Sequence, residues 1–146
     1  MRSMGVWNYG VFNLAHILGI ATLFGSVLVL DLRLLGLWRQ VTLSGIATPA
    51  VPLAFVGFSV ATLSGVCMLS VNAGEYVGNP FLLIKFPAIA LGLVNAAALS
   101  LSPVWRRVRK SSEPLPGDRR VLAVAGGMSL ACWLAAVSAG RMIGYW

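Results

Sequence analysis

Apolar residues form four long runs along the chain, separated by shorter polar or Pro/Gly-containing segments. The runs cover roughly residues 10–35, 49–71, 80–102 and 121–144. Crossing about 30 Å of hydrocarbon takes about 20 helical residues, a length that every run supplies. The pattern therefore predicts an all-α, polytopic membrane protein, a bundle of four transmembrane helices forming one domain over residues 1–146. Frequent Gly, Ala and Ser within the runs favour close helix packing in lipid.

The basic residues lie mainly between these runs. Arg33 and Arg39 flank the first connection, six further Lys and Arg fall between Arg106 and Arg120, and residues 72–80 contain none. Since cytoplasmic loops carry an excess of Lys and Arg, the first and third connections are predicted to be cytoplasmic and both termini to lie on the outer, periplasmic side. The third connection, 103–120, contains three prolines and is predicted to be a basic cytoplasmic loop. We expect a bacterial inner membrane.

The composition excludes most classes of soluble protein. The 146 residues are 58% hydrophobic and 10% charged, with a mean hydropathy of +0.85, whereas about a quarter of an ordinary globular chain is charged. The net charge of +7 sits mostly at the ends of apolar runs, which indicates membrane orientation and argues against a nucleic-acid partner. One histidine and two cysteines leave no zinc framework, disulfide scaffold or Ser-His-Asp hydrolase site of the familiar kind.

Three ionisable residues fall at one depth within the runs. With about 1.5 Å of rise per residue, His16 lies roughly 9 Å inside the predicted outer boundary, Lys85 roughly 8 Å and Arg141 roughly 6 Å. A histidine beside two cations suits a flat anionic ligand such as haem b or a porphyrin. His16 would then be the axial metal ligand or proton acceptor, with Lys85 and Arg141 at the carboxylates. The alternatives are a packing hydrogen bond for His16 and snorkelling of the two cations to the headgroups.

Other polar residues permit further hypotheses. Cys67 and Met68, with His16 and Met142, are soft ligands suited to Cu(I), although adjacent residues on a helix diverge by about 100°. Asp31 is expected to pair with a nearby arginine, and a proton relay with Asn95 is an alternative.

Short segments of the chain resemble small four-span bacterial membrane proteins. NLAHILGIATLFGSVLVLDLRLLGLW resembles the first span of the copper-resistance D and HemJ-type protoporphyrinogen oxidase families, and FLLIKFPAIALGLVNAAAL carries a lysine near its start as HemJ-type proteins do. The closing LAAVSAGRMIGYW looks like the end of an uncharacterised family in the same group. The resemblance to the HemJ-type family implies an essential pair at His16 and Lys85, associated with haem or porphyrin.

These observations together predict a small haem- or porphyrin-associated redox protein with its site near the outer face. A single histidine per chain allows one histidine ligand, so ligation by two would need a homodimer or a membrane partner subunit. The alternative is a non-catalytic membrane subunit or assembly factor, and a copper-handling or transport protein ranks last. The sequence leaves open whether the protein is an enzyme.

Overall fold

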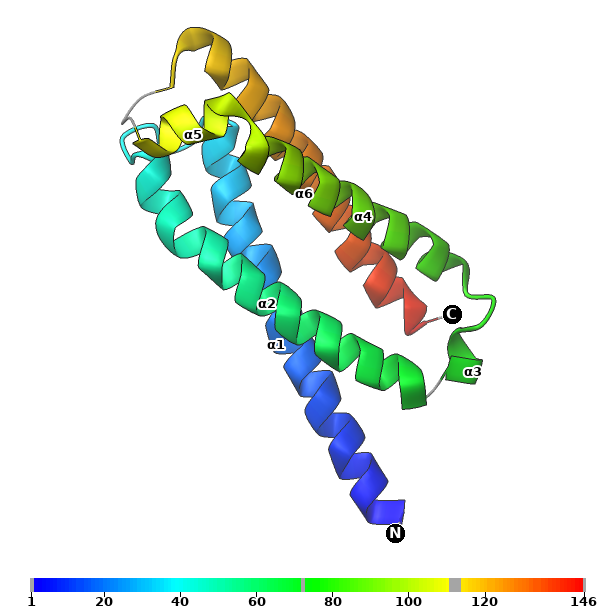
Figure 1. The fold of residues 1–146 in the computed structure, drawn as a ribbon. Helices are drawn as coiled ribbons and strands as arrows, with labels where there is room; N and C mark the ends of the chain where they lie inside the picture. The colour runs from blue at the N-terminus through cyan, green and yellow to red at the C-terminus, as the bar shows by residue number, and fades with distance from the viewer. Residues whose placement is uncertain (1, 72, 111–113, 146) are drawn as a thin grey trace.

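The computed structural model describes residues 2–71, 73–110 and 114–145, and over these residues it contains helices and no strand (Figure 1). Four helices are long and apolar enough to cross a membrane, which confirms the predicted spans. They are α1 (Arg2–Leu34), α2 (Leu43–Val71), α4 (Pro80–Leu101) and α6 (Pro116–Ile143); the short helices are α3 (Ala73–Tyr76) and α5 (Pro103–Lys110).

Three of the long helices begin earlier than the apolar runs, because a helix can continue past the hydrocarbon where its polar residues meet water or headgroups. Pro49 and Pro52 consequently lie inside α2. Part of the predicted third loop is also helical. Ser102 has an extended backbone, ending α4 before Pro103, and its hydroxyl accepts a hydrogen bond from the Trp105 N–H (3.2 Å) at the start of α5.

The four long helices form two hairpins. Helix α1 packs along α2, α4 packs along α6, and contacts between α1 and α6 join the two pairs. The hairpins approach each other at the end that holds α5 and diverge toward the end that holds α3 (Figure 1). We call the first of these the basic end, because the α1–α2 connection, α5 and the start of α6 carry most of the arginines.

Glycines set the closest approaches between helices. A Cβ atom built at Gly19 would lie 2.7 Å from the Ala61 backbone nitrogen, and one at Gly57 would lie 2.8 Å from the Gly19 carbonyl oxygen. Between the hairpins, a Cβ at Gly126 would meet the Leu34 Cβ at 2.8 Å. Small residues that let helix backbones approach closely favour the association of helices in lipid.

Two buried clusters complete the interior. Leu23, Ala88, Trp133 and Ala136 form the central cluster, against which Phe58 packs. The second cluster, at the basic end, consists of Leu34, Leu43, Val108 and Leu122. By contrast, large apolar side chains such as Phe55, Leu63 and Leu83 are strongly exposed. In a membrane these exposed side chains contact lipid.

The start of α6 is fixed by Asp118. Its carboxylate accepts hydrogen bonds from the Leu115 backbone N–H (3.4 Å) and from Arg107 Nη2 (2.6 Å). The Asp118 side chain is 8% exposed and that of Arg107 is 54% exposed. The carboxylate also lies in the first turn of the helix, where a negative charge is favourable.

We expect Asp118→Ala to lower the free energy of unfolding by about 1 kcal/mol, the usual cost of losing a helix cap. Arg107→Ala should cost less, because the Arg107 side chain is half exposed and the Asp118 carboxylate keeps its hydrogen bond to the Leu115 N–H. Unfolding with sodium dodecyl sulfate in mixed micelles, followed by tryptophan fluorescence, measures both. An equal loss in the two variants would assign the stabilisation to the ion pair instead of the cap.

Candidate functional site

His16 lies on the face of α1 that packs against α2. Its Nδ1 atom is 2.8 Å from the Ala61 carbonyl oxygen and 3.2 Å from the Ser64 hydroxyl. Because a carbonyl oxygen can only accept, Nδ1 must carry a proton in this hydrogen bond. In the neutral ring, Nε2 is then the unprotonated nitrogen and is available as a ligand or a proton acceptor.

The neighbouring turn of α2 fixes the ring of His16 in place. A Cβ atom at Gly65 would lie 3.1 Å from His16 Cε1, so the glycine provides the space that the imidazole occupies. The Ser64 hydroxyl donates to the Val60 carbonyl oxygen at 2.6 Å and is held in the same groove of the helix. The imidazole is therefore partly buried and oriented by backbone groups of α2.

Lys85 lies on the other hairpin. It is a partly buried residue of α4, and a Cβ at Gly140 of α6 would lie 3.7 Å from both its Cε and Nζ atoms. Helices α1 and α4 form no packed interface among the described residues. That His16 and Lys85 act on one ligand therefore stays a prediction from their common depth.

The side chain of Arg141 contacts Tyr145. Its Nη2 atom donates to the Tyr145 hydroxyl at 2.8 Å, and its guanidinium lies 5.0 Å from the centre of the Tyr145 ring. The residue is exposed, and the described contacts do not link it to His16 or Lys85. Arg141 follows Gly140 directly, so a different rotamer would be needed to bring its charge beside Lys85.

A second polar group lies deeper in the bundle. Asp31 is 2% exposed, and its Oδ2 atom has no hydrogen-bond partner among the described residues. Asn95 of α4 donates to the Ala125 carbonyl oxygen at 2.9 Å. Fifteen residues along α1 correspond to about 22 Å, so Asp31 is remote from His16.

The soft ligands suggested for Cu(I) lie on α2 and α6. Cys67 and Cys132 are free thiols. Met68 is partly buried on α2, whereas Met142 is exposed on α6. The described residues contain no group of three or more His, Cys, Asp or Glu side chains that could hold a metal ion.

Four long apolar helices make this chain a small multi-pass integral membrane protein. A scan of protein-family models and searches of curated proteins and of solved structures found no match to it. Its sidedness in the membrane stays a prediction from the distribution of Lys and Arg.

Proposed function

We propose that this membrane protein is a haem- or porphyrin-associated redox protein whose site lies between the hairpins, near the predicted outer face. The observation that carries the proposal is the orientation of His16. Its Nδ1–H is bound by the Ala61 carbonyl oxygen at 2.8 Å, which leaves Nε2 for a ligand. A carbonyl oxygen that accepts from the other ring nitrogen fixes the tautomer of a metal-binding imidazole and raises its basicity.

The residues present fit such a ligand in their chemistry. Imidazole is a common ligand of haem iron, and the Lys85 ammonium would supply a cation for a carboxylate group of the ligand. Arg141 would hold a second carboxylate after releasing Tyr145. When bound, haem would supply one-electron chemistry, while this chain would orient the ring and neutralise its carboxylates. A second histidine ligand would come from another copy of the chain or a partner subunit.

The first test is the absorption spectrum, with and without dithionite, of protein purified in mild detergent from haem-supplied cells. We expect a redox-sensitive Soret band that is lost in His16→Ala and weakened in Lys85→Ala. Asn13→Ala is the matched control, because Asn13 lies one turn earlier on α1 and is exposed. A featureless spectrum from well-folded wild-type protein would contradict the haem hypothesis. A Soret band unchanged in His16→Ala would show that His16 is not a ligand.

A non-catalytic membrane subunit or assembly factor is the second candidate. The same hydrogen bond favours it, because His16 joins α1 to α2 without needing any ligand. In this case His16→Ala should change only stability, by about 1 kcal/mol, in line with polar contacts measured between membrane helices. Copurifying partner chains without a cofactor would support this candidate, and copper found by elemental analysis would support a copper-handling role instead.

A further inference from the structure

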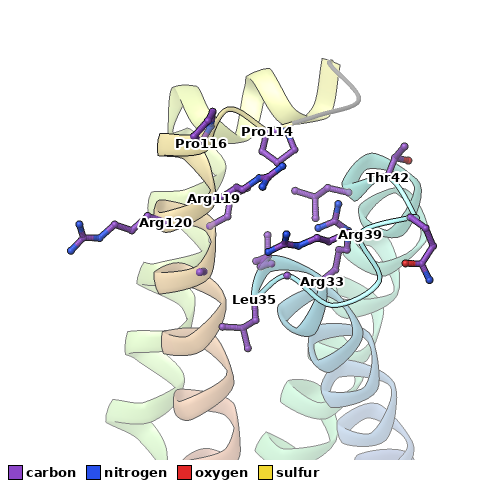
Figure 2. A pocket seen from close by; sticks show the side chains of 14 residues that line it. Arg33, Leu35, Arg39, Thr42, Pro114, Pro116, Arg119 and Arg120 are labelled. Carbon is purple, nitrogen blue, oxygen red and sulfur yellow. The ribbon is translucent and has the colours of Figure 1, made fainter.

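A cavity of about 510 Å³ lies at the basic end, far from His16, between the end of α1, the α1–α2 connection and the start of α6 (Figure 2). Among its described lining residues are no aspartate or glutamate and four arginines, Arg33, Arg39, Arg119 and Arg120. We call it the arginine cavity. Positive charge gathered in a recess attracts anions more strongly than the same charge spread over a surface.

The four arginines differ in direction. Arg39 and Arg119 extend toward the space from opposite sides, whereas Arg120 points away from it (Figure 2). Neither Arg39 nor Arg119 has a hydrogen-bond or ion-pair partner among the described residues. Arg33 has a structural role, because it is 8% exposed and its Nε donates to the Val41 carbonyl oxygen at 2.9 Å. Two guanidinium groups thus face one recess, and no described residue accepts a hydrogen bond from either.

The end of α1 explains how Arg39 reaches this position. Gly36 has φ +110°, and the Leu37 N–H bonds to the Leu32 carbonyl oxygen at 3.1 Å. Together with the Gly36 N–H to Arg33 carbonyl bond, also 3.1 Å, this is a Schellman motif that reverses the chain after α1. A Cβ at Gly36 would lie 3.5 Å from Arg39 Nη2. The guanidinium therefore folds back over the bare glycine toward the cavity.

The floor of the cavity is apolar and firmly packed. Leu34, Leu43 and Leu122 line it and are 6%, 2% and 3% exposed, respectively. All three belong to the buried cluster at the basic end. A recess with an aliphatic floor and a cationic rim, located where the spans end, matches an amphiphile that carries a phosphate. Guanidinium groups bind phosphate through paired, charge-assisted hydrogen bonds.

We propose that the arginine cavity binds a phosphate group between Arg39 and Arg119. The source that its position favours is the headgroup of an anionic phospholipid, since basic pockets between membrane helices on the cytoplasmic side bind such headgroups. A soluble phosphate is the other source of the same chemistry. The proposal does not depend on His16 or on a haem.

The test is a calorimetric titration of delipidated full-length protein in a neutral detergent. One arm uses dihexanoyl phosphatidylglycerol, with dihexanoyl phosphatidylcholine as the zwitterionic control, and the other uses inorganic phosphate. Arg39→Gln and Arg119→Gln should each raise the Kd by about tenfold or more. Arg120→Gln is the matched control: it removes the same charge from the adjacent residue and should change the Kd by less than about twofold.

The two arms separate the sources of the ligand. Tight binding of phosphatidylglycerol alone supports a lipid site, and binding of inorganic phosphate with the same dependence on Arg39 and Arg119 supports a soluble one. The proposal is overturned if folded wild-type protein binds neither probe, or if Arg120→Gln weakens binding as much as Arg119→Gln does. If a Gln variant loses its helical circular dichroism, Arg39→Lys and Arg119→Lys replace it. Each of these keeps the charge but not the two-donor fork, and should weaken binding to an intermediate degree.

Discussion

Replacing Trp133 with alanine is expected to lower the free energy of unfolding by about 3–5 kcal/mol, the usual cost of truncating a buried aromatic side chain. Trp133 is 6% exposed. Its ring meets Phe58 of the other hairpin edge to face, with the ring centres 6.3 Å apart, and a Cβ at Gly92 would lie 3.2 Å from it. The indole therefore fills space between the two hairpins in the central cluster.

Unfolding with sodium dodecyl sulfate in mixed micelles measures this loss. Trp7→Ala is the matched control, since Trp7 is 77% exposed and its removal should change stability by no more than about 0.5 kcal/mol. Trp133→Phe should retain part of the stability by keeping an aromatic ring against Phe58. If Trp133→Ala were as stable as Trp7→Ala, the central cluster would not hold the hairpins together.

The second large effect is expected at Gly57. A Cβ there would collide with the Leu23 backbone nitrogen and lie 2.8 Å from the Gly19 carbonyl oxygen, so only backbone atoms stand in its way. Backbone cannot move aside as a flexible side chain can. Gly57→Ala should therefore separate α1 from α2 locally and cost about 1–3 kcal/mol. Gly57→Leu should prevent the hairpin from closing.

Gly25→Ala provides the comparison within the same hairpin. Nothing lies within 4 Å of a Cβ at Gly25, and alanine favours helix over glycine by up to about 1 kcal/mol. Stability should therefore stay constant or rise slightly in the same detergent unfolding assay. A destabilised Gly25→Ala together with an unaffected Gly57→Ala would contradict the observed α1–α2 interface.

The four spans could be predicted from the sequence because the length of each apolar run is enough to identify a span. The ends of the helices could not, since α1, α2 and α6 continue into polar residues that hydropathy assigns to loops. Pro49 and Pro52 stand at the start of the second apolar run and lie inside α2. Residues 103–110 form α5 because Pro103 stops α4 and Ser102 caps the next helix. That local signal was available in the sequence.

The depth of the candidate site residues in the membrane could be predicted from the sequence, but the direction of their side chains around each helix could not. Counting residues from the membrane boundary brought His16, Lys85 and Arg141 to one depth. The direction in which a side chain points around its helix depends on which faces of the helices pack together. The glycines determine the packed faces, and this becomes visible only in the assembled bundle. In the structure, Lys85 lies against Gly140 of α6, while Arg141 turns to Tyr145. The sequence gives no sign of the latter contact beyond the spacing of four residues.

The arginine cavity could not be predicted from the sequence for a related reason. In the sequence, Arg39 and Arg119 are only signals of membrane orientation, and they are 80 residues apart. Their convergence depends on the packing of the first hairpin against α6, which becomes visible only in three dimensions. The glycine at position 36, three residues before an arginine and just after an apolar run, is the local clue that would have pointed to it.

The division into two hairpins has a consequence for biosynthesis. The interface between α1 and α2 is made entirely by residues before position 72, so it can form while the ribosome is still making the rest of the chain. Trp133 emerges some sixty residues after α2 is complete, and its insertion against Phe58 must come late. A first hairpin completed in this way would exist before α6 is made, and its inner face would be covered once α6 packs against α1.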